Sequence, residues 1–404
     1  MTYQAHFENG VIVLDEPANL PDGAKVRVEL LGGGANRTWV SIELSKGQIL
    51  TNLLIISLLT FSFWNVSGQS ATINLSDFVR LTDLGAGVKP EAINSNGQIV
   101  GQGSNGQAFS WENGTMTALG TLGGVESFAN DVNDNGVVVG WSLDSEGKQK
   151  GFKWDGALVN LDSVSTLSSS AEAVNNLGHI VGWKTNGSVF RSSLWSEADP
   201  NGFLAFGTGN HKAIGINDHG EVVGVTLDGN NALDEGFFWN GIDPISDISG
   251  SLGQDYFPIA GVNNNSATAG FHVTTASIMS IGTSDPSPLG KLLNSDPFSR
   301  SLGLNDAGLI VGESGLTAFA FDLSTNTLYN MNDFNRLGFK PESMLRLTDI
   351  NNDGTFIGIA RFNGIDHGVS GNFVVVPEPS TFDIMTLGIP RLVIWLFSSE
   401  EEKN

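Results

Sequence analysis

The sequence predicts an all-β protein whose body, residues 79–376, is a seven-bladed β-propeller. A short phrase, [IV]-N-x-x-G-x-[IV]-V-G, recurs seven times with small variations. The asparagines that open it are 39, 42, 42, 46, 42 and 46 residues apart. This period of about 43 residues is typical of four strands per blade. The 51 glycines and the charged fraction of 16% also suit many short strands joined by tight turns.

Each phrase reads as strand, turn, strand. Its asparagine opens a type I turn through a side-chain hydrogen bond, and the glycine three residues on takes the left-handed conformation. We therefore assign a structural role to Asn94 and Gly97, Asn133 and Gly136, Asn175 and Gly178, Asn217 and Gly220, Asn305 and Gly308, and Asn351 and Gly354. The fifth phrase has Asn263 but carries Ser266 in place of glycine, so its geometry is the least regular.

The remaining strands follow each turn. An Ile/Val run predicts a strand buried on both faces, an aromatic unit marks the third strand, and a fourth strand comes after it. Four tryptophans recur at the blade period in the third strand, which indicates core positions first and sugar-stacking platforms second: Trp111, Trp154, Trp195 and Trp239.

Ring closure is predicted from the two ends of the body. Blade seven has little room for a fourth strand after residues 367–373. Residues 79–84, ahead of the first repeat, are similar in sequence to the fourth strand predicted at Met116-Thr-Ala-Leu119-Gly120. We expect residues 79–84 to form the outer strand of blade seven, beside residues 367–374, because an open seam would leave backbone groups unpaired.

The repeat phrase, with its following Ala-Phe-x-Trp unit and Leu119-Gly-Thr-Leu-Gly-Gly124, resembles the HAF repeat family of bacterial extracellular proteins. The resemblance covers about 290 residues. It implies an exported repeat protein and does not name a ligand.

Residues 1–31 form a separate opening unit. Two apolar alternations, 11–14 and 26–30, flank the turn residues 20–23 and predict a β-hairpin. The motifs Glu8-Asn-Gly-Val11 and Leu20-Pro-x-Gly23 resemble the N-terminal part of short AbrB-like antitoxins. This resemblance implies toxin neutralisation; a hairpin without that activity is the other interpretation.

An export signal is predicted after a glycine-rich linker, residues 32–48. The apolar segment 49–70 follows Lys46 and precedes small residues, so we interpret it as a helical signal peptide cut near Gly68 to Ala71, or as a signal anchor. A buried core helix is the third interpretation.

The C-terminal segment, residues 377–404, begins with Pro377-Glu378-Pro379 and continues into an apolar stretch expected to be helical. It resembles the PEP-CTERM sorting signal, which implies export and sorting machinery as partners. Pro390, Arg391 and the acidic tail Glu400–Asn404 depart from that family's pattern.

Several chemistries find no support in the sequence. A net charge of −23 disfavours nucleic acid and anionic lipid, so membrane contact is expected only through the terminal apolar segments. There is no cysteine, no histidine cluster with metal spacing and no catalytic motif in context. The Asp131–Gly136 and Asn351–Gly354 phrases are similar to calcium loops but lack the later carboxylate, which favours plain turns. We expect no cofactor, no metal and no catalytic residue.

These observations predict an exported, noncatalytic protein of the cell surface or matrix, a scaffold for extracellular polysaccharide or protein. One alternative is a secreted glycan-active enzyme, which converging carboxylates in the central channel would favour. The other is a toxin–antitoxin component acting through residues 1–31.

Overall fold

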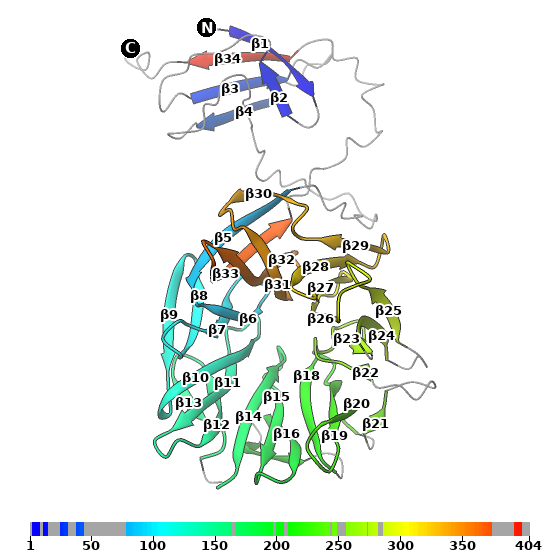
Figure 1. Ribbon diagram of the computed structural model, residues 1–404. Coiled ribbons are helices and arrows are strands. Elements are labelled where there is room, and N and C mark those ends of the chain that lie inside the picture. The colour runs from blue at the N-terminus through cyan, green and yellow to red at the C-terminus, as the bar shows by residue number, and fades with distance from the viewer. Residues whose placement is uncertain are drawn as a thin grey trace. The chain divides into compact units, whose positions relative to one another are not determined.

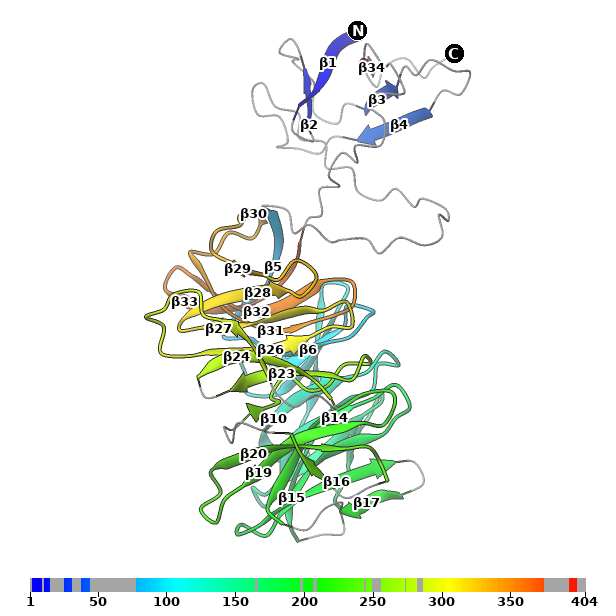
Figure 2. The same ribbon diagram turned by 90° about the vertical axis from the view of Figure 1, so that its right-hand side faces the viewer.

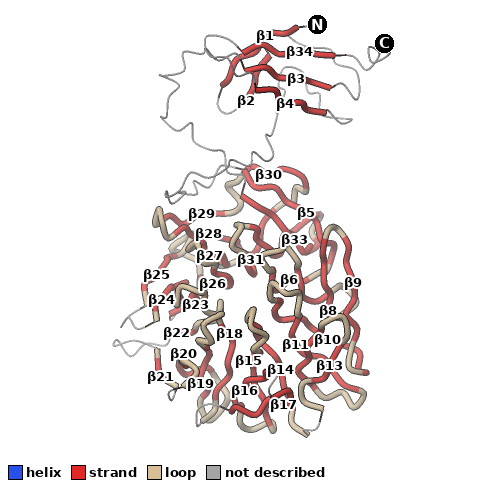
Figure 3. Tube along the Cα trace, turned by 180° about the vertical axis from the view of Figure 1, so that it is seen from behind, coloured by secondary structure: helices blue, strands red, loops and turns tan. Residues whose placement is uncertain are grey.

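The computed structural model describes residues 78–373, except 164–165, 197–198, 206–208, 243–244, 249–255, 273 and 282–285, together with five strands outside that range. Every regular element of the described residues is a strand (Figure 3). The chain divides into two compact units, residues 76–374 and residues 1–75 with 375–404. In the part of the chain that the structure describes, no helix is long and apolar enough to cross a membrane.

The larger unit is a seven-bladed β-propeller, as the sequence predicts (Figure 1). Blade 1 consists of β6 (Lys89–Ile93), β7 (Ile99–Gln102), β8 (Ala108–Glu112) and β9 (Thr115–Gly120). Blade 2 consists of β10 (Gly123–Val132), β11 (Val138–Asp144), β12 (Gln149–Trp154) and β13 (Leu158–Asn160). Blade 3 consists of β14 (Ser168–Val174), β15 (Ile180–Thr185), β16 (Phe190–Ser196) and β17 (Asp199–Ala205).

The next three blades repeat this antiparallel order. Blade 4 consists of β18 (His211–Ile216), β19 (Val222–Leu227), β20 (Leu233–Trp239) and β21 (Ser246–Asp247). Blade 5 consists of β22 (Tyr256–Phe257), β23 (Ala267–His272), β24 (Thr275–Ser280) and β25 (Ser287–Gly290). Blade 6 consists of β26 (Ser299–Leu304), β27 (Leu309–Ser314), β28 (Thr317–Asp322) and β29 (Thr327–Asn330).

Blade 7 joins the two ends of the propeller. Its strands β31 (Ser343–Ile350), β32 (Thr355–Phe362) and β33 (Ile365–Phe373) are followed in space by β5 (Phe78–Ala86), which pairs antiparallel with β33 (Figure 1). The predicted closing strand is confirmed. A further strand, β30 (Asn335–Gly338), pairs parallel with the outer side of β5 (Figure 2). This strand covers backbone groups that the sequence analysis left at the edge.

The core lies between neighbouring blades. One cluster of buried side chains, for example, joins Val100 and Ala108 of blade 1 to Val138 and Phe152 of blade 2. Within each blade, the glycine that ends the repeat phrase permits close strand pairing, since a Cβ on Gly140 would collide with the carbonyl oxygen of Phe128 on the paired strand.

The smaller unit contains a five-stranded sheet in the order β2-β1-β34-β3-β4. Its strands are β1 (Thr2–Glu8), β2 (Val11–Leu14), β3 (Lys25–Leu30), β4 (Thr38–Glu43) and β34 (Leu392–Phe397).

Two expectations for this unit are wrong. Residues 11–14 pair with β1 rather than with 26–30, because Glu8 and Val11 face each other across the two-residue Asn9-Gly10 link, a strong hairpin signal. The C-terminal apolar segment is a strand at 392–397 rather than a helix, and its β-branched and aromatic residues pair between β1 and β3. The predicted signal segment 49–70 and sorting residues Pro377, Glu378 and Pro379 lie outside the described residues.

Candidate functional site

An asparagine ladder surrounds the axis of the propeller. The Asn94 Nδ2 donates to the carbonyl oxygen of Asn133 in the next blade at 2.9 Å, and Asn351 closes the circle on Asn94 at 3.0 Å. Five equivalent bonds link Asn133, Asn175, Asn217, Asn263, Asn305 and Asn351. Every junction between blades therefore carries one side-chain bond of the same kind.

The same side chains also build the turns. The Asn133 Oδ1 accepts from the amides of Asn135 and Val137, and the residue three positions after each ladder asparagine has a φ of 56–84°. Ser266, which replaces glycine in blade 5, adopts this conformation too, at 56°. The oxygens of these asparagines are thus used within the turn rather than directed at a ligand.

A second row of bonds lies one residue further along each turn and bridges six of the seven junctions. Backbone amides donate to the Oδ1 of the counterpart in the next blade at 2.8–3.0 Å from Ser95 round to Asp306. Amide groups alternate with carboxylates here, as Asn176 Nδ2 lies 3.2 Å from Asp134 Oδ2 and 3.1 Å from Asp218 Oδ2. These donors offset the repulsion between the acidic side chains.

The central channel contains two hollows, of 210 Å³ beside the ladder and 230 Å³ towards the other end of the inner strands. Carboxylates line the second hollow from four blades: Glu91, Asp131, Glu172 and Asp349. Aliphatic side chains from blades 4, 5 and 6 complete it, among them Ile214, Ile259 and Leu302. The channel therefore brings together acidic groups far apart in the sequence.

Two of these carboxylates join inner strands. Asp131 accepts from its neighbour Val132 and, across the junction, from the Val174 amide, both at 2.8 Å. Asp349 likewise accepts from Ile350 at 2.8 Å and from Ile93 in blade 1 at 3.0 Å. Burial raises the pKa of Asp131 to about 6 and that of Asp349 to about 7, against the opposite effect of these hydrogen bonds.

The other two carboxylates lie near cations. Glu172 accepts from Trp183 Nε1 at 2.7 Å and interacts with Lys212, whose Nζ lies 5.0 Å from the Trp183 ring centroid. Burial raises the pKa of Glu172. Burial likewise raises the pKa of Glu91 to about 7, although the positive charge of Arg346 acts in the opposite direction. Of these four residues only Asp131 stood out in the sequence, in a phrase similar to a calcium loop. The others did not, since acidic residues are common and only the convergence of the inner strands brings them together.

A larger hollow, of 610 Å³, lies between blades 1 and 2 on the side of the asparagine turns. We call it the inter-blade groove; blade 1 contributes Gln98, Ser110, Glu112 and Thr117, and blade 2 contributes Trp154 and Asp155. Trp154 is partly exposed and packs against the apolar cluster between the same two blades. Its equivalents Trp195 and Trp239 are buried, at 1% and 6% exposure, as the core interpretation predicts.

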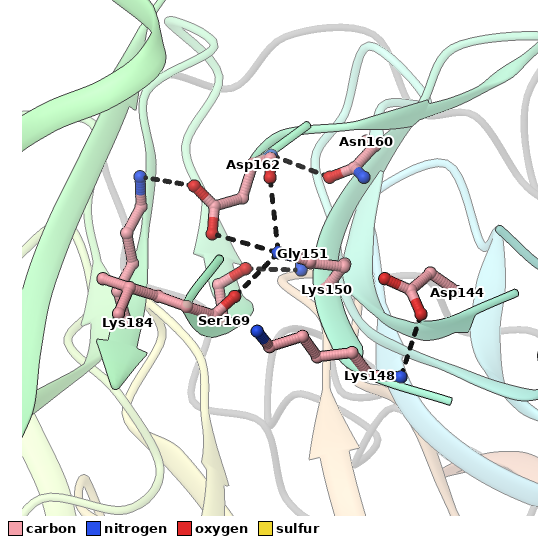
Figure 4. Close-up of polar contacts among 9 residues, drawn as sticks. Asp144, Lys148, Lys150, Gly151, Asn160, Asp162, Ser169 and Lys184 are labelled. Carbon is pink, nitrogen blue, oxygen red and sulfur yellow. Dashed lines mark hydrogen bonds and ion pairs between the residues drawn. The ribbon is translucent and has the colours of Figure 1, made fainter. Parts of the chain in front are cut away.

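The junction of blades 2 and 3 contains a buried ion cluster instead (Figure 4). The Asp162 carboxylate lies between Lys184 Nζ, at 2.9 Å, and Lys150 Nζ, at 3.9 Å. Lys150 also donates to the Leu167 carbonyl at 2.7 Å, and Ser169 Oγ accepts from the Gly151 amide at 3.0 Å. These contacts bind the two blades to each other and to the loop between them.

No metal-binding constellation occurs in the described part of the chain, where no three His, Cys, Asp or Glu side chains gather suitably.

Comparison with known proteins identifies the fold alone. No family model and no curated protein matches the sequence. The structure of U3-55K is similar at a TM-score of 0.50 and 10% identity, over 73% of this chain and 98% of that one. A Thermus thermophilus protein provisionally assigned as an oxidoreductase (glucose dehydrogenase) gives 0.37 at 13% identity, over 72% and 99%. The extracellular domain of a B. thetaiotaomicron protein, provisionally assigned as a one-component system, gives 0.42 at 12% identity, over 71% and 38%.

Proposed function

We propose that this protein is an exported, noncatalytic scaffold of the cell surface or matrix that binds extracellular polysaccharide or a protein partner. The proposal that the protein is noncatalytic rests on the hydrogen bonds of two channel carboxylates. Asp131 and Asp349 each accept two backbone amides, one of them across a blade junction. Groups held in this way stabilise the ring and are poorly placed to exchange protons with a substrate.

Support for export comes from the sequence: the segment 49–70 after Lys46, the Pro377-Glu378-Pro379 motif and the HAF-like repeats. Cell fractionation of the native protein combined with intact mass measurement tests this part. We expect the protein in the envelope or matrix fraction, with residues 1 to about 68 removed. Full-length protein in the cytoplasm would contradict the proposal.

The same mass measurement bears on the antitoxin alternative. Cleavage near Gly68 would remove β1 and β3, the two neighbours of β34, along with the antitoxin-like residues. A mature protein that retains residues 1–31 and binds a cognate toxin would favour that alternative instead.

A glycan-active enzyme is the second candidate, and the channel carboxylates favour it. General acids need a raised pKa, and those of Glu91, Glu172 and Asp349 are all raised. Incubation with neutral and acidic polysaccharides, followed by assays for new reducing ends and for unsaturated products, separates the two candidates. We expect no turnover. Turnover that Glu91→Gln abolishes would establish the enzyme.

A further inference from the structure

The inter-blade groove results from a polar replacement at one repeat position. Gln98 follows the turn glycine in blade 1 as Val137 follows it in blade 2. Val137 is buried in one cluster with Leu161 and Trp195, which closes the junction of blades 2 and 3. Gln98 instead donates to Ser110 Oγ at 2.9 Å and accepts from Asn94 Nδ2 at 3.2 Å. Gln98 and Ser110 therefore form a polar wall of the groove, whereas apolar side chains occupy the equivalent space at the next junction.

Trp154 provides a rigid apolar surface opposite this wall. It pairs with Val138 on the neighbouring strand as the buried Trp195 pairs with Ile180, so the backbone fixes both residues alike. Because the polar Gln98 occupies the position that Val137 fills at the next junction, part of the indole remains accessible and lines the hollow, while the rest packs against the apolar cluster. An exposed indole held by the core on one side can stack on an apolar ligand face without a large loss of side-chain entropy.

The other lining groups are hydroxyl, amide and carboxylate. Thr117 is exposed on the outer strand of blade 1, and Ser110 and Gln98 lie behind it. Glu112 and Asp134 make the groove negative, and its lining includes no lysine or arginine; Asp155 also lines it and pairs with Lys153, which lies outside the lining, at 3.8 Å. Such a surface can bind many hydroxyl groups and repels phosphate, carboxylated sugars and nucleic acid.

We propose that the inter-blade groove binds a glycosyl unit of an uncharged polysaccharide. The sugar ring stacks on Trp154, and its hydroxyl groups bond to the amide, hydroxyl and carboxylate groups of blade 1. A volume of 610 Å³ falls in the range of ordinary ligand sites. The inference deepens the proposed function, on which it rests, by naming the ligand class and the blades that bind it.

The test is affinity electrophoresis of the purified full-length chain in gels containing dextran, galactomannan or polygalacturonate. We expect a neutral polysaccharide to retard the wild type and polygalacturonate to leave it unretarded. Trp154→Leu keeps an apolar side chain against the core but removes the stacking surface. Thr117→Arg places a long side chain in the groove from an exposed strand position. Each variant should weaken binding roughly tenfold or more.

Trp111→Leu is the matched control. Trp111 occupies the same position of blade 1, pairing with Ile99, and it packs towards blade 7 rather than lining the groove. This variant should bind within about twofold of the wild type. Circular dichroism of all three variants shows whether the fold persists, and Thr117→Arg keeps the test decisive if Trp154→Leu unfolds.

The outcomes separate this inference from the proposed function. Wild-type affinity that persists in both groove variants overturns the inference and leaves a scaffold that binds polysaccharide elsewhere. Wild-type protein that binds only polygalacturonate, or none of the three polymers, also overturns it. Loss of binding in both groove variants, with native protein found in the cytoplasm, supports the groove and contradicts the exported scaffold.

Discussion

The junction of blades 1 and 2 and the junction of blades 2 and 3 share the asparagine ladder and differ in their other contacts. Each has one ladder bond, from Asn94 in the first and from Asn133 in the second, both 2.9 Å long. Outside the ladder, the first junction holds the inter-blade groove with Trp154. The second holds the buried Trp195 and the Asp162 ion cluster.

This difference separates the ladder contacts, which every repeat retains, from the outer contacts, which vary between junctions. A ring closes only if every junction is bridged, so the asparagine appears in all seven phrases, even where serine replaces the turn glycine. The outer contacts affect one junction at a time, so polar and apolar solutions can coexist. Ligand specificity is therefore expected where the repeats disagree, and structural roles where they agree.

The largest expected effect comes from the ion cluster that only the second junction has. Asp162→Ala removes the carboxylate between two buried ammonium groups and should lower the free energy of unfolding by about 3–5 kcal/mol. Its control is Asp155→Ala, which removes an exposed partner of Lys153 at 3.8 Å and should cost under about 1 kcal/mol. Urea unfolding of both variants measures the difference; equal costs would contradict the assigned role of Asp162.

The ladder should be equally costly to break at both junctions. Asn94→Ala and Asn133→Ala each remove one bond across the junction and the acceptor of two turn amides, at a cost of about 2–3 kcal/mol. Asn186→Ala is the control, since its side chain accepts from Ser188 and Val189 at an exposed hairpin tip. Thermal unfolding compares the three, and a control as damaging as the ladder variants would show that turn formation alone matters.

The fold was predictable because its determinants recur. Seven phrases at blade spacing, six of them with the turn glycine, indicated both the number of blades and the turn geometry, and the likeness of residues 79–84 to a fourth strand placed the closing strand. The channel carboxylates and the groove were not predictable in the same way. Glu91 and Glu172 share one repeat position and Asp131 and Asp349 share the next one, but their proximity depends on how the inner strands converge. A one-residue difference such as Gln98 for Val137 has meaning only once the neighbouring tryptophan is located.

The wrong predictions also have a physical origin. The segment 392–397 is apolar on successive residues, a pattern shared by buried helices and central strands. It pairs on both sides in the sheet, where such a strand is favoured. Chain order suggested pairing of residues 11–14 with 26–30, yet the shorter link at Asn9-Gly10 brings β1 and β2 together.

A smaller effect is expected from exchanging the residues that distinguish the two junctions. Val137→Gln places an amide against Trp195 and should cost about 2 kcal/mol, because that cluster offers it apolar neighbours. Gln98→Val should change stability by less than about 1 kcal/mol, since the lost bonds to Ser110 and Asn94 are offset by apolar contact with Trp154. Urea unfolding measures both variants. A large loss in Gln98→Val would mean that the polar wall is itself a stabilising element.

The smallest effect concerns the carboxylate that joins the inner strands at the second junction only, where the corresponding residue of blade 1 is Ala92. Burial raises the pKa of Asp131 to about 6 in the folded protein, from an ordinary value of 3.8, and Asp134 adds to the rise. An acid whose pKa is raised on folding binds protons more readily in the folded state, so its contribution to stability declines as the pH rises from about 4 to 6. Asp131→Asn removes this titration while keeping an oxygen for the Val174 amide. Between pH 4.5 and 7 we expect the wild type to lose about 1–2 kcal/mol relative to Asp131→Asn, measured by urea unfolding at each pH. Parallel pH profiles would contradict this expectation and would show that the charge of Asp131 does not affect the contact between the inner strands. In that case Ala92→Asp, which places a carboxylate at the equivalent position of the first junction, would also leave the free energy of unfolding unchanged.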